Sequence, residues 1–110
     1  MKNYPVRYSP EAVNDLNAVW DDVYEASKSY DTADNYVEGL MDKIKEKRTF
    51  PQSGIPLMYG NLFTGFYSVN FKMYKAFYRL KDGFIEVVRV LMSRCDYMKV
   101  LFNDVTNEEG

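Results

Sequence analysis

The side chains best suited to chemistry lie in the last third of the 110-residue chain. They are three cations and a phenol: Lys75, Arg79, Arg94 and Tyr97. Such a set can contact an anion, because ammonium and guanidinium groups donate charged hydrogen bonds. It can equally be structural, since Arg79 is predicted to lie opposite Glu86 as a cross-strand ion pair, whereas Lys75 has no predicted partner. Local pairing and the rim of a basic site are therefore both kept as interpretations.

The composition excludes several classes of enzyme. The chain has no histidine, which is the residue most often used as a general base near neutral pH and the commonest metal ligand. Zincin metalloproteases, Ser-His-Asp hydrolases and ribonucleases that use a histidine pair are ruled out. Cys95 is the single cysteine, so we interpret it as a small, semi-buried residue that forms no internal disulfide. We expect neither a cofactor nor a metal.

Charge is distributed unevenly along the chain. Residues 1–49 carry 7 basic and 10 acidic side chains, residues 66–102 carry 7 basic and 3 acidic, and residues 103–110 carry 3 acidic. The net charge of −2 is the sum of an acidic first half, a basic second half and an acidic tail. The basic half is able to orient a polyanion or an acidic partner segment, or it simply complements the acidic helices.

The length indicates a single domain, which we place at residues 1–102, followed by an acidic tail at residues 103–110 that we expect to be disordered. No apolar run approaches the roughly 18 residues that a membrane span needs, and the N-terminus lacks the apolar segment of a signal peptide. A lone thiol fits a reducing compartment. We therefore expect a cytoplasmic protein with no membrane partner.

Two helices are predicted in the first half, after a strand at residues 4–8. The first helix has a strong start signal, because Ser9 is a good cap and Pro10 suits the first helical position. Its apolar residues recur at three- and four-residue spacing: Val13, Leu16, Trp20, Val23 and Ala26. A second helix is predicted with Asp31 as its cap. The short connection makes the two helices an antiparallel hairpin.

Three strands are predicted in the second half, at residues 66–71, 73–80 and 84–92, after a loop to about residue 65. Asp82-Gly83 is a strong signal for a two-residue hairpin turn. That turn fixes a register with these opposite pairs: Leu80 and Ile85, Arg79 and Glu86, Tyr78 and Val87, Ala76 and Arg89. Apolar residues fall on both faces, so we expect the helices to cover one face and a partner protein to cover part of the other.

Five segments, in this order, resemble the RelE/ParE superfamily of toxins from type II toxin-antitoxin systems. They are Tyr-x-Val-x-Tyr-Ser-Pro-Glu-Ala at residues 4–12, Asp-Leu-Asn-Ala-Val-Trp at 15–20, Phe-Pro-Gln-Ser-Gly-Ile-Pro at 50–56, Phe-Tyr-Arg at 77–79 and Val-Val-Arg-Val-Leu-Met-Ser-Arg-Cys-Asp-Tyr at 87–97. The resemblance implies an α+β fold of order β-α-α-β-β-β, in which a three-stranded antiparallel meander joins the first strand in one sheet. It also implies a growth-inhibiting toxin that forms a hetero-oligomer with a cognate antitoxin encoded by an adjacent gene.

The superfamily has two branches with different targets. RelE-like members cut messenger RNA in the ribosomal A site without a metal, and ParE-like members poison DNA gyrase. Many RelE-like nucleases have lysines where this chain has Ser68 and Asn70, and an arginine where it has Lys75. Met92 stands where ParE-like relatives often have a histidine. These departures weaken the candidate catalytic set of Lys75, Arg79, Arg94 and Tyr97.

The resemblance with these departures favours a ParE-like toxin that inhibits growth by binding DNA gyrase and that belongs to a plasmid-stabilisation system. The alternative is a ribosome-dependent, metal-independent mRNA endonuclease with a weakened active site. A further alternative is a catalytically inactive module that only binds partners. Each of these three functions predicts a different assay result.

Overall fold

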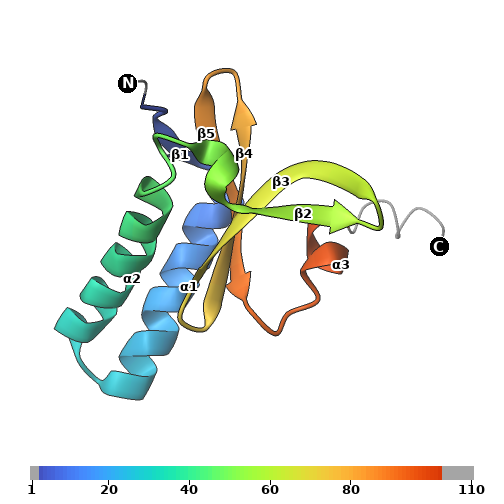
Figure 1. The fold of residues 1–110 in the computed structure, drawn as a ribbon. Coiled ribbons are helices and arrows are strands. Elements are labelled where there is room, and N and C mark those ends of the chain that lie inside the picture. Colours follow the sequence, from blue (N-terminus) through green and yellow to red (C-terminus); the bar gives the residue numbers. More distant parts are fainter. Residues whose placement is uncertain (1–2, 103–110) are drawn as a thin grey trace.

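The computed structural model describes residues 3–102, so the tail expected at residues 103–110 lies outside the described residues. The elements follow the order β1, α1, α2, the 3-10 turn η1, β2, β3, β4, β5 and α3 (Figure 1). The fold is thus α+β, as predicted, with one strand more than the sequence indicated.

The first helix begins where the sequence predicts. The hydroxyl of Ser9 accepts a hydrogen bond of 3.0 Å from the Ala12 N–H, and α1 extends over Pro10–Ser27. The same hydroxyl donates to the Val88 carbonyl at 2.9 Å. Since Val88 belongs to the sheet, this one side chain both caps α1 and fixes its start against the sheet.

The second helix, α2, covers Tyr30–Lys45 and is capped by Ser29, whose hydroxyl accepts from the Thr32 N–H at 3.1 Å. The predicted cap, Asp31, was therefore wrong by two residues. Lys28 ends α1 in the left-handed conformation with φ 56°, which turns the chain at once and brings Ser29 into the cap position. The predicted antiparallel hairpin is confirmed, and Figure 1 shows α1 and α2 side by side.

A strand occupies part of the segment that was predicted as a loop to about residue 65. After η1 (Pro51–Ser53), β2 covers Ile55–Tyr59 and pairs antiparallel with β3, which covers Leu62–Phe71. The proline content of this segment favoured a loop, but β2 is an edge strand, where a missing N–H is tolerated. The predicted three-stranded meander is therefore a four-stranded one.

The five strands form one sheet of order β1-β5-β4-β3-β2. The short β1 (Val6–Tyr8) runs parallel to β5 (Phe84–Met92), and every other neighbouring pair is antiparallel. The remaining strand, β4, covers Tyr74–Lys81. The prediction that the first strand joins the later ones in a single sheet is confirmed.

The register of the β4–β5 hairpin is confirmed near its turn and wrong farther away. Three predicted pairs are present: Leu80 and Ile85, Arg79 and Glu86, Tyr78 and Val87. A bulge follows, so that Arg89 lies opposite Phe77 instead of Ala76. An extra residue in one strand shifts all later pairs by one, and a turn signal carries no information about it.

The main core lies between the sheet and the helix hairpin. Its buried residues come from both helices and three strands: Ala12, Leu16, Val19, Leu40, Ile44, Val69, Tyr74, Ala76, Tyr78, Ile85, Val87 and Val90. The helices therefore cover one face of the sheet, as expected. Within residues 3–102, no helix is long and apolar enough to cross a membrane.

Tyr78 links this core to η1. Its hydroxyl donates to the Pro51 carbonyl at 2.6 Å, and its ring has no exposed surface. Burial raises the pKa of Tyr78 to about 12, because the phenolate is disfavoured away from water. Burial together with the nearby charge of Asp42 raises the pKa of Tyr8 to about 12 as well.

Candidate functional site

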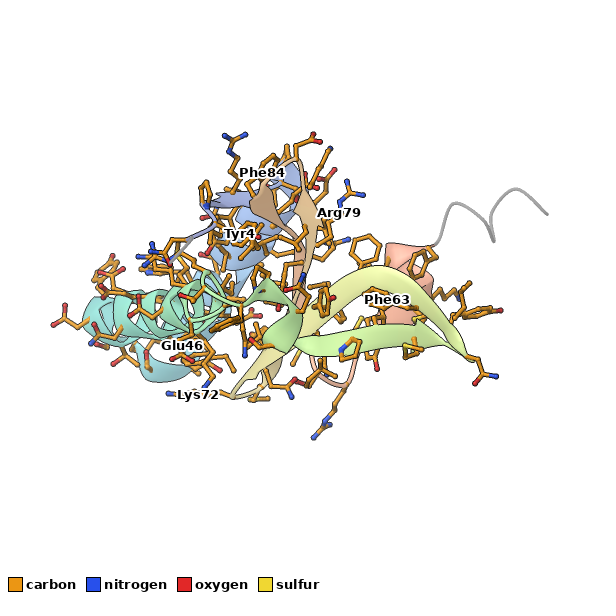
Figure 2. The ribbon with its side chains drawn as sticks, turned by 45° about the horizontal axis from the view of Figure 1, so that its top comes forward. Tyr4, Glu46, Phe63, Lys72, Arg79 and Phe84 are labelled. Atoms are coloured by element: carbon orange, nitrogen blue, oxygen red, sulfur yellow. The ribbon has the colours of Figure 1, made fainter. Side chains whose placement is uncertain are left out.

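Lys75 and Arg79 both project from β4 on the face of the sheet opposite the helices. Their positions alternate with the core residues of the same strand, and successive side chains of a strand point to opposite faces. Figure 2 shows Arg79 projecting from the sheet away from α1 and α2. Phe77 lies between them and is fully buried.

Tyr97 reaches the same face because α3 (Tyr97–Leu101) crosses it. Asp96 caps this short helix by accepting a hydrogen bond of 3.3 Å from the Lys99 N–H. The Tyr97 ring packs on Phe77 with 5.1 Å between ring centroids, and the Lys75 ammonium lies 5.6 Å from the centre of the Tyr97 ring. The structure thus brings Lys75 and Tyr97 together, with the cation over the aromatic face.

Arg79 is engaged in the pair that the sequence predicted. Its Nε lies 2.9 Å from Oε1 of Glu86, and its guanidinium lies 5.7 Å from the centre of the Phe66 ring. The Arg79 side chain is nevertheless 40% exposed. The structural interpretation therefore accounts for the position of Arg79, and its outer edge stays accessible to a partner.

Arg94 does not join the other three residues. It is exposed and follows β5, where it borders a small hollow of about 230 Å³ with Met73, Met92 and Ser93. In the described part of the chain, no hydrogen bond, ion pair or ring contact connects Arg94 to Lys75, Arg79 or Tyr97. The four predicted site residues are thus one contacting pair, one ion-paired arginine and one separate arginine.

The separation of Lys75 and Arg79 is too large for both side chains to bind a single phosphate. Lys75 and Arg79 are four residues apart on one strand, which places their Cα atoms roughly 13 Å apart. Ser68 and Asn70, neutral side chains, lie opposite Phe77 and Lys75 on β3. Across residues 3–102, no group of three histidine, cysteine, aspartate or glutamate side chains is arranged to hold a metal ion.

The sequence did not indicate the pair between Arg89 and Asp15. Asp15 on α1 accepts two hydrogen bonds from the Arg89 guanidinium, at 2.7 and 3.0 Å, and a third from the Val90 N–H at 2.9 Å. The hydrogen bonds that Arg89 donates to Asp15 raise the pKa of Arg89 above its ordinary value. The pair joins α1 to the bulged part of β5, so Arg89 is bound within the fold and not presented to a ligand.

A second feature missed from the sequence is an apolar groove on the α3 side of the molecule. It has a volume of about 720 Å³, and we call it the hairpin groove. Its walls come from the β2–β3 hairpin and from the α3 segment: Tyr59, Leu62 and Phe63 on one side, Met98, Lys99 and Phe102 on the other. The signal that could have revealed it is the run of apolar residues within the segment that was predicted as a loop.

The groove exists because the hairpin bends. The β2–β3 register shifts at Leu57, whose carbonyl accepts a hydrogen bond of 2.7 Å from the Thr64 hydroxyl, and Gly65 on the facing strand has φ +91°. Figure 1 shows the outer part of the hairpin curving away from the helices toward α3. Figure 2 shows Phe63 beside α3, on the opposite side of the molecule from Glu46.

Comparison with known proteins gives one family and a consistent fold. Residues 6–97 match the family described as the ParE toxin of type II toxin-antitoxin system, parDE. A search of curated protein sequences finds no significant match. The family match and the structural matches below confirm the resemblance to the RelE/ParE superfamily that the sequence segments indicated.

Three solved structures have a similar fold. A chain of the chromosomal ParDE system from P. aeruginosa has a TM-score of 0.65 and 18% identity, covering 81% of this chain and 95% of its own. The RelBE2 toxin-antitoxin complex from Mycobacterium tuberculosis gives 0.53 and 21%, covering 82% and 98%. YafQ from E. coli gives 0.56 and 16%, covering 90% and 98%. At these identities the likeness concerns the fold alone.

Proposed function

We propose that this chain, which belongs to the ParE toxin family of type II toxin-antitoxin systems, inhibits growth by binding DNA gyrase. The observation that supports this target over messenger RNA is the separation of the candidate nuclease groups. Lys75 contacts Tyr97, Arg79 is paired with Glu86, and Arg94 contacts none of the other three. Cleavage of RNA needs charged groups that converge on one phosphate, so a toxin with this arrangement is better suited to act by binding.

The test is a supercoiling assay. Purified toxin is added to gyrase, ATP and relaxed plasmid, and the conversion to supercoiled plasmid is followed on a gel. We expect inhibition at micromolar toxin, and relief of inhibition when the product of the adjacent gene is added. Full supercoiling activity at that concentration would exclude gyrase as the target.

The contact between Lys75 and Tyr97 is the observation that favours a second candidate, an mRNA endonuclease with a weakened site. A cation and a phenol at this spacing can contact a single phosphate and a nearby base. Primer extension on translated messages would then show new 5′ ends after toxin expression, and Lys75→Ala would abolish them. Unchanged 5′ ends together with unaffected translation would remove this candidate.

The exposed hairpin groove favours a third candidate function, that of a module that only binds partners. Expression of the chain without the adjacent gene distinguishes it from both toxins, because only an active toxin arrests growth. We further propose that the adjacent gene encodes a cognate antitoxin, that the two proteins form a hetero-oligomer in the cytoplasm, and that the system stabilises a plasmid.

A further inference from the structure

Three aromatic side chains gather at the connection between α1 and α2. The rings of Trp20 and Tyr24, one turn apart on α1, stack with 5.4 Å between centroids and 9° between planes. Tyr30, the first residue of α2, packs on both, at 4.9 Å from Tyr24 and 5.7 Å from Trp20. We call these three rings the aromatic platform. Figure 1 shows the α1–α2 connection at the lower left, on the other side of the molecule from α3.

Core packing does not account for the aromatic platform. Its rings lie outside the main core, which consists of other residues from both helices and the sheet. Trp20 and Tyr24 are half-buried, and Tyr30 is 66% exposed. A buried ring stabilises the fold by leaving water, whereas Tyr30 keeps most of its surface in solvent. The platform therefore presents an aromatic surface that nothing in the described chain covers.

The segment that forms the platform is acidic. Residues 20–35 contain five acidic side chains and one basic side chain, and the basic one, Lys28, is paired with Glu25 at 2.9 Å. Asp34 accepts a hydrogen bond of 2.8 Å from Nε1 of Trp20 through Oδ1, and among residues 3–102 it forms no ion pair. Because a carboxylate can accept about four hydrogen bonds, Asp34 can still accept from a cation at the edge of the platform.

An exposed aromatic surface beside a carboxylate suits a guanidinium group. The arginine side chain is planar, so it can stack on an aromatic ring and donate hydrogen bonds to a carboxylate at the same time. The ammonium of lysine is a compact, strongly hydrated charge, which suits this combination less well. Nucleic-acid bases also stack on aromatic rings, but the same carboxylates repel their phosphates. The chemistry therefore favours a protein segment that carries arginine.

We infer that the aromatic platform binds an arginine side chain in a basic segment of a partner protein, with the guanidinium stacked on Tyr30 and hydrogen-bonded to Asp34. The platform lies on the helix hairpin, whereas Lys75 and Tyr97 lie on the opposite face of the sheet and the hairpin groove lies beside α3. The inference thus goes beyond the proposed function and does not depend on which target the toxin has.

The single tryptophan of the chain provides the measurement, because its indole N–H gives an NMR signal of its own and lies in the platform. The full chain, isotopically labelled, is titrated with a synthetic peptide of three arginines separated by glycines. We expect the indole signal to shift and to saturate at millimolar peptide, since exposed cation–π and ion-pair contacts are individually weak. The same peptide with lysines should bind about threefold more weakly, and the peptide with glutamates should cause no shift.

Matched tyrosine variants test the ring. Tyr30→Ala removes the exposed ring and should weaken binding of the arginine peptide by about threefold to fivefold. Tyr30→Phe keeps a ring and should bind within about twofold of the unsubstituted chain. Tyr59→Ala is the control, because Tyr59 is 69% exposed at the tip of the β2–β3 hairpin, and it should leave the affinity unchanged. Urea unfolding checks that each variant is folded, and exposed positions should leave the midpoint almost unchanged.

Matched aspartate variants test the charge. Asp34→Asn should weaken binding by about twofold to fivefold and reduce its dependence on salt, because the ion pair with the guanidinium is lost. The amide oxygen of the variant can still accept from the Trp20 indole, so the platform itself is kept. Asp42→Asn, about two turns farther along α2, is the control and should change neither quantity.

A saturating shift that is weakened in Tyr30→Ala and kept in Tyr59→Ala supports the inference. If the arginine peptide causes no shift, or if these two variants bind it equally, the platform is not the site. If the lysine peptide binds as tightly, or if choline shifts the indole signal at the same concentration, the platform does not select arginine. If sedimentation shows a dimer of the toxin that Tyr30→Ala dissociates, a second copy of this chain supplies the arginine and the inference is wrong. Gyrase takes part in none of these measurements, so their failure leaves the proposed function standing.

Discussion

The two sides of the sheet differ in how completely they are covered. On the helix side, α1 and α2 fill the face, and Leu40 and Ile44 of α2 are almost wholly buried. On the other side, α3 covers only a part, so that Phe77 is buried while Tyr59 and Leu62 at the hairpin tip are largely exposed. Both sides are apolar, and within the described chain only the helix side is covered by long packed helices.

This difference separates residues that fold the protein from residues that are free to bind. Burial of apolar area stabilises the folded state, so core packing is enough to explain the apolar residues on the helix side. An exposed Leu62 contributes little to folding, and it belongs to an exposed apolar patch of the kind that is typical of binding surfaces. Substitutions on the two sides should therefore affect different measurements.

The largest effect is expected when a core leucine is shortened. Leu40→Ala leaves a cavity between α2 and the sheet, and we expect it to lower the free energy of unfolding by about 3 kcal/mol. Leu62→Ala, the same change at the hairpin tip, should lower it by less than about 0.5 kcal/mol. Urea unfolding followed by circular dichroism measures both, and equal losses would contradict the distinction between the two sides.

A smaller effect is expected at the link between α1 and the β5 bulge. Asp15 accepts three hydrogen bonds and its side chain is only 15% exposed, so Asp15→Ala should cost about 2 kcal/mol by leaving the Arg89 guanidinium and the Val90 N–H without their acceptor. Glu86→Ala is the control on the α3 side.

The control removes the partly exposed pair with Arg79, which should cost less than about 1 kcal/mol. Both variants are compared by their urea midpoints. A loss from Glu86→Ala as large as that from Asp15→Ala would mean that the two ion pairs are equally important to the fold.

A still smaller loss than that of Asp15→Ala is expected at neutral pH for Tyr78→Phe, which removes one hydrogen bond to Pro51 and should cost about 1 kcal/mol. The informative range is alkaline. The pKa of Tyr78 is raised from 10.0 to about 12 in the folded state, so the unfolded chain loses this proton first, and stability falls as the pH rises from about 10 toward 12.

Unfolding midpoints measured from pH 8 to pH 12 test this sign. Tyr78→Phe should make the alkaline decrease shallower and leave the parts that Tyr8 and Tyr74 cause, because burial raises the pKa of Tyr8 to about 12 and also raises the pKa of Tyr74. Tyr59→Phe, at the exposed hairpin tip, is the control at neutral pH, where it should leave the midpoint almost unchanged. An alkaline decrease that is unchanged in Tyr78→Phe would show that Tyr78 ionises equally in both states.

Apart from the single sheet, which the family resemblance implied, the features that the sequence predicted correctly are those determined by neighbouring residues. The Ser9 cap and the Asp82-Gly83 turn act over a few positions, and both are present in the structure. The bulge in β5 was not predictable in this way, because Asp15, which binds the Val90 N–H beside it, is 75 positions away. The strand β2 was missed because its pairing with β3, not its composition, makes it a strand.

The candidate site was predicted in part for the same reason. Arg79 opposite Glu86 follows from the hairpin register alone, and it is present. The contact of Lys75 with Tyr97 depends on the path of the chain after β5, which brings α3 back over the sheet. That same path leaves Arg94 outside the site, and it creates the hairpin groove, so neither was visible in local patterns.

The most direct test of the division between the two sides is amide hydrogen exchange of the chain, alone and bound to the product of the adjacent gene. We predict that binding slows exchange most in residues 58–64 and 97–102, which form the walls of the hairpin groove, and changes it little in the core strands β4 and β5, which are already protected. Protection confined to α1 and α2, with the hairpin and α3 unchanged, would contradict the account.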